Sequence, residues 1–111
     1  TIGTPADLNR FFGALLGGKL LRAEQLAAMR STVDAPGYAT VDGSRYGLGI
    51  ATFNLSCGGF AWTHGGNAPG YTTVTGTTED GRSATIAVTA LPTVIEAVQD
   101  LDKALDTALC G

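Results

Sequence analysis

The spacing of apolar residues changes once along the chain, from helical to strand-like, near Gly43. Before that point leucines and phenylalanines recur every three or four residues, the period of an amphipathic helix. After it, apolar residues alternate with small or polar ones, the period of a β-strand. Consecutive strands that follow a helical segment are typical of an α+β fold, because an α/β fold interleaves the two periods. We therefore expect two N-terminal helices, an antiparallel sheet of about four strands and a C-terminal helix packed on one face of the sheet.

Two helices are predicted in the first part of the chain. Thr4-Pro5-Ala6-Asp7 combines a hydroxyl N-cap, a proline at the first helical position and an acid at the third, and Gly17-Gly18 ends the apolar run. A shorter helix is expected from Ala23 to Ser31. The stretch from Thr32 to Ser44 has no period and is predicted to be a loop.

Four strands are then predicted, at residues 45–53, 60–64, 71–78 and 83–91. Glycines in the first of them indicate a close approach of another backbone, a helix or a ligand. Residues 65–70 are expected to form a break or a wide turn after the second strand. A final helix is predicted after Thr93, with Glu96 completing a capping box. Its apolar stripe, which we expect to cover the sheet, comprises Val94, Ile95, Val98, Leu101, Leu105 and Leu109.

Composition excludes several classes of protein. The 111 residues are 44% hydrophobic and 15% charged, which argues for one folded core and against disorder. The seven Lys and Arg residues are scattered, so no nucleic-acid-binding patch is predicted. No apolar run is long enough to span a bilayer, and no signal peptide opens the chain. Because there is no initiator Met and a helix begins almost at once, we expect the chain to be the tail of a longer protein.

Few residues could carry chemistry by themselves. A single histidine and two cysteines make a metal site a weak proposal, and no phosphate or dinucleotide loop is present, so we expect no metal and no cofactor. The feature that remains is the strand end Trp62-Thr63-His64-Gly65-Gly66-Asn67. Two residues without side chains let a substrate or a catalytic serine approach, and exposed N–H groups there can hold an oxyanion. The same residues are also compatible with an ordinary strand end and turn.

The two cysteines lie at predicted element ends, Cys57 in a turn and Cys110 next to the C-terminus. A disulfide between them would tie the last helix to the sheet and contribute roughly 4 kcal/mol in the chain-entropy model. Two unrelated thiols in a cytosolic protein are equally compatible with the count alone.

The order of motifs resembles the C-terminal part of the penicillin-recognising serine hydrolases. The motifs are Thr-Pro-Ala-Asp-Leu, Leu-Leu-Gly-Gly-Lys-Leu-Leu, Tyr-Gly-Leu-Gly-Ile, Ser-Cys-Gly-Gly and Trp-Thr-His-Gly-Gly, followed by two strands and a helix. The most similar branch is the class C-like one, with secreted D-alanyl-D-alanine carboxypeptidases, class C β-lactamases and related esterases and D-amino-acid peptidases.

The resemblance implies roles for the residues at the strand end. His64, Gly65 and Gly66 would form the third catalytic motif of the family, and the backbone N–H of Asn67 would be one of two oxyanion donors. Thr63, Gly65 and Asn67 would contact the substrate. The Cys57–Cys110 bridge looks like one found in the carboxypeptidase branch, which implies a secreted or extracytoplasmic protein.

The chain departs from the family pattern in ways that matter for activity. Neither the Ser-x-x-Lys nucleophile motif nor the Tyr-x-Asn motif is present, and in the family both precede the part that corresponds to Thr1. We therefore expect residues 1–42 to belong to the helical region of such an enzyme and residues 43–111 to its α/β region. The expected partner is an N-terminal fragment of the same enzyme carrying Ser-x-x-Lys, and the chain alone should be inert.

The expected substrate is a small peptide, ester or β-lactam. Gly65 lacks the hydroxyl with which carboxypeptidases of this type bind a terminal carboxylate, and Ala51 and Thr52 stand where that branch tends to have an Arg. An esterase, amidase or β-lactamase-like relative therefore fits as well as a carboxypeptidase.

Two other functions compete with the hydrolase hypothesis. One is a non-catalytic binding module that kept the fold and lost the nucleophile. The other is an N-terminal nucleophile enzyme, in which autoproteolysis exposes Thr1 and its own amine acts as the base. The second is disfavoured because Thr1 precedes a helix cap instead of opening a strand.

Overall fold

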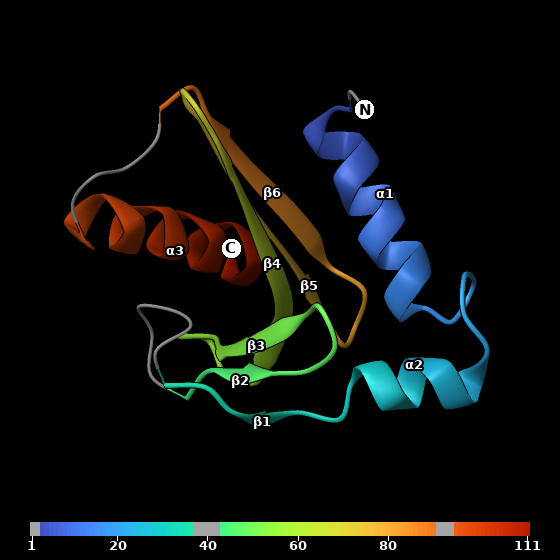
Figure 1. Ribbon diagram of the computed structural model, residues 1–111. Helices are drawn as coiled ribbons and strands as arrows, with labels where there is room; N and C mark the ends of the chain where they lie inside the picture. The colour runs from blue at the N-terminus through green and yellow to red at the C-terminus, as the bar shows by residue number, and fades with distance from the viewer. Residues whose placement is uncertain (1–2, 37–42, 91–94) are drawn as a thin grey trace.

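The protein is described by a computed structural model for residues 3–36, 43–90 and 95–111 (Figure 1). The helices are α1 (Pro5–Leu16), α2 (Ala23–Met29) and α3 (Ile95–Cys110). The strands are β1 (Val33–Asp34), β2 (Arg45–Tyr46), β3 (Ala51–Asn54), β4 (Phe60–Ala68), β5 (Tyr71–Thr78) and β6 (Ser83–Val88). Thr1, the nucleophile of the disfavoured alternative, and Thr93, the expected cap of the last helix, lie outside the described residues.

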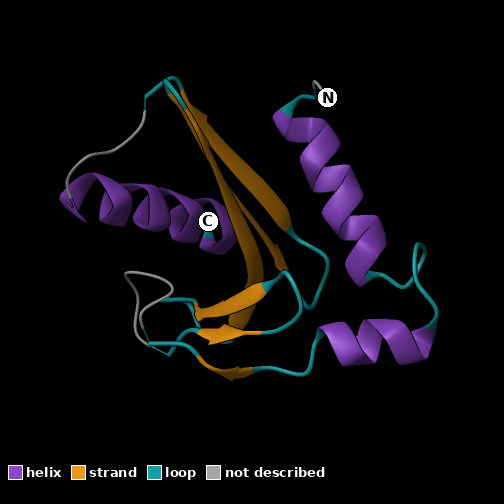
Figure 2. Ribbon diagram, in the orientation of Figure 1, coloured by secondary structure: helices purple, strands orange, loops and turns teal. Residues whose placement is uncertain are grey.

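All the strands belong to one antiparallel sheet, in the order β1-β2-β3-β4-β5-β6. Helices flank the strands instead of alternating with them along the chain (Figure 2). The predicted α+β class is therefore confirmed. The predicted number of strands is wrong, because the described residues form six strands and not four.

One of the additional strands arises where a single strand was predicted from Arg45 to Phe53. That segment is divided into β2 and β3 by a turn in which the Gly47 N–H donates to the Ile50 carbonyl at 2.7 Å. A Cβ atom on Gly47 would lie only 2.2 Å from the carbonyl oxygen of Met29 at the end of α2. Glycine is thus required by the close approach of a helix, one of the possibilities that the sequence indicated.

The other additional strand, β1, lies within the segment predicted as a loop. Asp34 is directly opposite Arg45 in the register of β1 and β2. The guanidinium of Arg45 donates to the Asp34 carboxylate and, at 2.9 Å, to the hydroxyl of Thr32. These contacts hold a two-residue strand that has no apolar alternation to reveal it in the sequence.

The helices α1 and α3 pack on opposite faces of β5 and β6 (Figure 1). Leu105 and Leu109 of α3 are 1% and 2% exposed and lie in a cluster with Phe53, Leu55 and Ala61. On the other face, Leu16 of α1 packs with Ile50 and Trp62. The predicted cover of the sheet by the last helix is confirmed for Leu105 and Leu109, whereas Val98 on the same helix is 36% exposed.

The start of α1 follows the capping box that the sequence predicted. The Asp7 N–H donates to the Thr4 hydroxyl at 3.1 Å, and the Thr4 N–H donates to the Asp7 carboxylate at 2.9 Å. The second of these bonds lowers the pKa of Asp7 below its usual value, because the donor stabilises the carboxylate. The helix ends at Leu16, directly before the predicted Gly17-Gly18 stop, and α2 ends two residues before the predicted Ser31.

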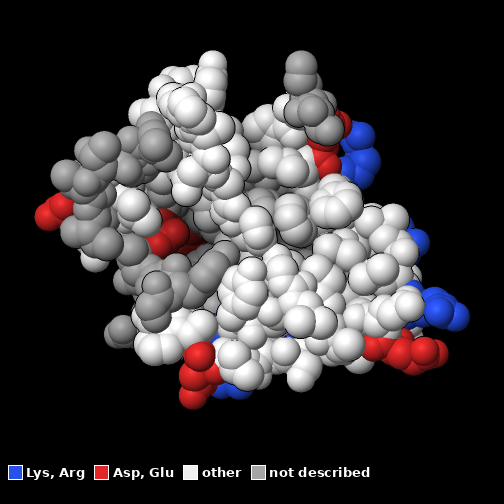
Figure 3. All heavy atoms as spheres, viewed as in Figure 1, with Lys and Arg blue, Asp and Glu red and all other residues white. Residues whose placement is uncertain are grey.

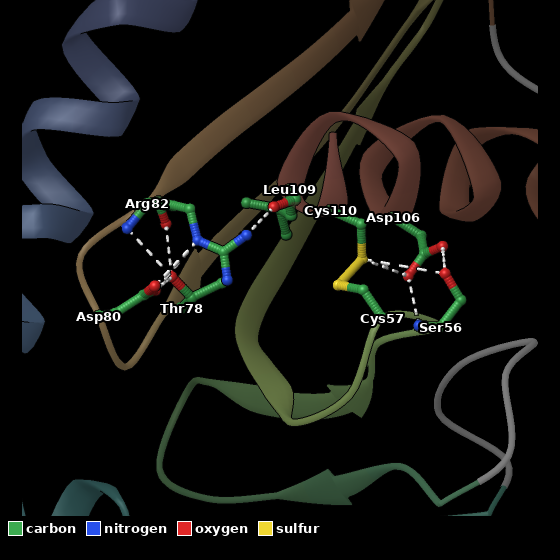
Figure 4. The surroundings of a disulfide bond; sticks show 8 residues. All are labelled: Ser56, Cys57, Thr78, Asp80, Arg82, Asp106, Leu109 and Cys110. Carbon is green, nitrogen blue, oxygen red and sulfur yellow. Dashed lines mark hydrogen bonds and ion pairs between the residues drawn. A yellow bond between two sulfur atoms is a disulfide. The ribbon is translucent and has the colours of Figure 1, made fainter.

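A disulfide joins Cys57, in the β3–β4 turn, to Cys110 at the end of α3, with the two Cα atoms 5.7 Å apart (Figure 4). Beside it, the N–H and the hydroxyl of Ser56 donate to the Asp106 carboxylate at 2.9 and 2.5 Å. The expected bridge is thus present, and it links α3 to the sheet across a sequence separation of 53 residues. No described helix has the length and apolarity that a membrane crossing requires.

Removing this bridge is expected to destabilise the protein. The double substitution Cys57→Ser/Cys110→Ser should lower the free energy of unfolding by about 2–4 kcal/mol, because it relaxes the constraint on the unfolded chain. Urea unfolding followed by circular dichroism measures the change. Ser56→Ala is the matched control in the same turn, and it should cost only about 1 kcal/mol. Equal urea concentrations at the unfolding midpoint for the double variant and the unaltered protein would contradict the prediction.

Candidate functional site

The predicted active-site strand is longer than the sequence indicated. Residues 65–70 were expected to be a break or a wide turn, but β4 continues through His64 to Ala68, paired residue by residue with β5. The connection is the two-residue turn Pro69-Gly70, in which Gly70 adopts a φ of 79°. Proline followed by a glycine with positive φ is the pattern of a type II turn. This pattern was the signal in the sequence that could have revealed the continuous hairpin.

Half of β4 has a neighbour on one side only among the described residues. β3 pairs with β4 from Phe60 to Thr63, whereas β5 pairs with it as far as Ala68. The segment His64–Ala68 is therefore a free strand edge, and all of its residues are exposed. Backbone N–H and C=O groups along such an edge can pair with an added extended chain.

The register identifies which backbone groups lie on the free edge. The Leu55 N–H donates to the Gly59 carbonyl at 3.0 Å, so the backbone of Gly59 is directed toward the β3 side. In an antiparallel sheet alternate residues direct their N–H and C=O groups toward the same neighbour. Counting along β4, Gly65 and Asn67 direct theirs to the free edge, whereas His64, Gly66 and Ala68 bond to β5.

The side chains along the edge lie on two faces of the sheet. His64 is opposite Thr75, which is opposite Thr85. Thr75 and Thr85 share a hydrogen bond of 2.9 Å, and Thr85 donates to Asn9 of α1 at 2.7 Å. His64 therefore lies on the face that α1 covers, while Gly65 and Asn67 lie on the face that α3 covers.

The two glycines of the edge are not required by the backbone conformation. Neither Gly65 nor Gly66 has a positive φ. A Cβ atom on Gly65 would lie 3.4 Å from the Thr73 carbonyl oxygen, and one on Gly66 would lie 3.1 Å from the Thr73 hydroxyl. Their effect is to leave the free edge without side chains, so that another molecule can approach the backbone closely.

Thr63, the remaining residue expected to contact a substrate, is buried. Its hydroxyl donates to the Thr75 carbonyl at 2.7 Å. The preceding Trp62 donates from its indole nitrogen to Glu79 at 2.7 Å and lies 5.6 Å below the guanidinium of Arg30. These contacts anchor the paired half of β4 and so hold the free half in a defined direction.

The edge is almost uncharged. Strands β3 to β6 contain no Lys, Arg, Asp or Glu, and His64 is their only histidine. In the face shown in Figure 3, Lys and Arg atoms gather toward the right and lower margins. Within the described ranges no group of three or more His, Cys, Asp and Glu residues could hold a metal ion.

The profile of the Beta-lactamase family matches residues 1–109. The chain belongs to this family. A D-stereospecific amidohydrolase from Streptomyces sp. is 37% identical in sequence, with a TM-score of 0.66 over 77% of this chain and 25% of that one. Two structures of a D-amino acid amidase from Ochrobactrum anthropi SV3, complexed with L-phenylalanine and with D-phenylalanine, are 21% identical, each with a TM-score of 0.79 over 96% of this chain.

These solved structures are much longer than the chain. It covers 25% of the Streptomyces amidohydrolase and 30% and 31% of the two amidase structures. The amidase structures show the same fold, and the family match supports membership of a hydrolase family.

Proposed function

We propose that this chain supplies the His64-Gly65-Gly66 strand of a secreted serine hydrolase that acts on amide or ester substrates through an acyl-enzyme. The observation that carries the proposal is the exposed free edge of β4, on which the N–H groups of Gly65 and Asn67 have no strand partner among the described residues. An acyl-transfer site needs such a donor at the position of the developing oxyanion.

In the proposed reaction the nucleophile comes from a Ser-x-x-Lys segment outside these 111 residues. The serine oxygen attacks the carbonyl carbon of the substrate, and the carbonyl oxygen becomes an oxyanion. The backbone N–H of Asn67 and that of the serine itself donate to this oxyanion. The scissile C–N or C–O bond then breaks, and the amine or alcohol leaves with the proton that the serine hydroxyl lost. Water finally hydrolyses the acyl-enzyme and frees the serine.

His64 and the glycines have different parts in this proposal. The imidazole of His64 is exposed beside the edge, where it sets the local electrostatics and orients the attacking or leaving group. Gly65 and Gly66 keep the edge open to the substrate backbone. We further propose that residues 1–42 belong to the helical region of the enzyme and residues 43–111 to its α/β region.

The proposed location is outside the cytoplasm. The Cys57–Cys110 bridge supports it, because disulfides persist in oxidising compartments. The similarity to a D-stereospecific amidohydrolase at 37% identity favours an amide substrate within the wider class of peptides, esters and β-lactams.

Intact mass spectrometry after treatment with a fluorophosphonate tests the proposal. The protein is purified together with any polypeptide that accompanies it, and its mass is measured before and after labelling. An adduct on a segment that carries Ser-x-x-Lys is the expected result. An adduct within residues 1–111 would overturn the proposal, because none of the serines there has the required lysine three residues later.

A non-catalytic binding module is the second candidate. It would be favoured if no polypeptide carrying Ser-x-x-Lys accompanied the chain. It predicts no adduct on any polypeptide in the preparation and no hydrolysis of amides or esters, so the same experiment decides between the two functions.

A further inference from the structure

We propose that the Cys57–Cys110 bridge is a site of thiol–disulfide exchange that discriminates between small thiols by their charge. An external thiolate enters at the Cys57 sulfur, and Cys110 is the leaving group. The Asp106 carboxylate beside the bridge favours cationic thiols over anionic ones. The inference concerns the bridge alone and does not rest on the proposed hydrolase function.

Asp106 holds a carboxylate against one sulfur of the bridge. Its Oδ1 atom lies 3.6 Å from the Sγ atom of Cys110 (Figure 4). Both of its oxygens accept hydrogen bonds from Ser56, which donates its N–H at 2.9 Å and its hydroxyl at 2.5 Å. Ser56 is a neutral donor, so these bonds fix the carboxylate without cancelling its charge. A fixed negative charge therefore lies beside Cys110.

The two sulfurs of the bridge differ in access. Cys57 is an exposed residue of the β3–β4 turn, and it is followed by Gly58 and Gly59, which have no side chains. Cys110 is half-buried at the end of α3, next to Asp106. A thiolate attacks a disulfide sulfur in line with the bond that breaks, so Cys110 would have to be attacked from the α3 side and Cys57 from the open turn. Entry at Cys57 is therefore favoured.

The exchange proceeds in two steps. The external thiolate donates an electron pair to the Cys57 sulfur and forms a new S–S bond. The Cys57–Cys110 bond breaks, and its electron pair leaves on the Cys110 sulfur, which takes a proton from water. A second thiolate then attacks the external sulfur of the mixed disulfide and releases Cys57. The bridge gains two electrons, and two external thiols are oxidised to their own disulfide.

Asp106 acts on both the departing and the entering groups. Negative charge that develops on the Cys110 sulfur is repelled by the carboxylate, which slows exchange with every thiol. Because Cys110 is the last residue of α3, the partial negative charge of the helix C-terminus acts in the same direction. The substituent of the entering thiol lies within the screening length of about 10 Å, so an ammonium group is attracted and an anionic group is repelled.

The other charged groups near the bridge act in the same sense. A hollow of about 230 Å³ between β3 and α3 adjoins Ser56, and its charged lining is Asp102, Lys103 and Asp106, one more acid than base. Arg82 bonds to the last turn of α3 but also pairs with Asp80 at 3.1 Å, apart from the bridge (Figure 4). The local charge around the bridge is thus negative, which favours a cationic thiol.

Three small thiols of similar size test the selectivity: 2-mercaptoethylamine, 2-mercaptoethanol and 2-mercaptoethanesulfonate. Reduction of the bridge is followed by mass spectrometry at one fixed pH, on the purified protein together with any polypeptide that accompanies it. Each rate constant is expressed per thiolate and divided by that for a small uncharged disulfide. The cationic thiol should react about tenfold faster than the anionic one, with the neutral thiol between them. Equal rates or the reverse order would overturn the inference.

Asp106→Asn tests the origin of the selectivity. It keeps the size of the side chain and removes the charge, so the cationic-to-anionic ratio should fall to about threefold or less, and the neutral thiol should react about tenfold faster. Asp100→Asn is the matched control, because it removes the same charge from α3 ten positions before Cys110, about 15 Å along the helix axis. Equal changes in the two variants would contradict the role of Asp106.

Ser56→Ala separates the charge from the contact that fixes it. This variant loses the hydroxyl bond to Asp106 but keeps the carboxylate, and a loosened turn speeds all three thiols alike, so the ratio should stay near tenfold. A ratio as low as that of Asp106→Asn would show that the charge is not the cause. If Asp106→Asn does not fold, as judged by circular dichroism, about 1 M salt added to the unaltered protein should lower the ratio to about threefold or less, and an unchanged ratio would overturn the inference.

The site of entry is measured separately. N-ethylmaleimide is added soon after 2-mercaptoethylamine, and the digested protein is mapped by mass spectrometry. The expected product carries the thiol substituent on Cys57 and the maleimide on Cys110. The opposite placement would show that the thiolate enters at Cys110 and would overturn the assignment of Cys57 as the exchange site.

Discussion

Replacing Asn67 by proline is expected to slow acylation of the proposed serine by about 10²–10³-fold. Proline removes the backbone N–H that we assign to the oxyanion, and loss of one such donor has an effect of this size. The N–H of Asn67 lies on the free edge of β4 and is not part of the ladder with β5, so proline removes no sheet hydrogen bond. The rate of fluorophosphonate labelling, followed by mass spectrometry, measures the loss.

Asn67→Ala is the control for this substitution. It removes the same side chain and retains the N–H, so its labelling rate should stay within about tenfold of that of the unaltered protein. Similar rates for the proline and alanine variants would show that the backbone donor has no part in the reaction.

The largest loss of stability is expected from Leu105→Ala. Leu105 is 1% exposed and lies between α3 and the sheet, in the cluster with Phe53 and Leu109. Truncation leaves a cavity at this contact, which should lower the free energy of unfolding by about 2–5 kcal/mol. Urea unfolding monitored by circular dichroism provides the value.

Val98→Ala on the same helix is the matched control. Val98 is 36% exposed, so removal of its methyl groups should lower the free energy of unfolding by less than about 1 kcal/mol. Equal free energies of unfolding for the two variants would contradict the prediction that Leu105 packs α3 on the sheet.

The helices could be predicted from the sequence because their signals are local. The Thr4–Asp7 capping box joins residues three apart, and Gly17 follows the last helical residue directly. The Pro5–Leu16 helix therefore begins and ends where the sequence indicates. The Cys57–Cys110 bridge was only one of two possibilities from the count, and the resemblance to a family decided between them.

The strands were predicted less well because their limits depend on distant partners. The split between β2 and β3 results from contact of Gly47 with Met29, which lies 18 positions earlier in the chain. The length of β4 results from β5, which pairs with it through both glycines of the edge. A local pattern cannot show either effect, since the glycines resemble breaks until a neighbouring strand is in place.

The residue types of the candidate site were evident from the sequence, whereas their arrangement was not. His64, Gly65, Gly66 and Asn67 were identified by their order and by resemblance. Only the register with β3 and β5 shows that Gly65 and Asn67 direct their N–H groups to an open edge. The orientation of the Asn67 amide likewise depends on Thr72, because the hairpin places the two residues opposite one another.

The sequence alone thus determined the α+β class, the bounds of α1 and the residues around which a site could form, because periodicity and capping act within a few residues. Only the tertiary structure showed that β3 pairs with β4 no further than Thr63, which leaves His64–Ala68 without a neighbouring strand on that side. The physical reason is that the backbone N–H and C=O groups of a strand are paired only where another strand lies beside them. The side chains of the strand itself do not show where that neighbour ends.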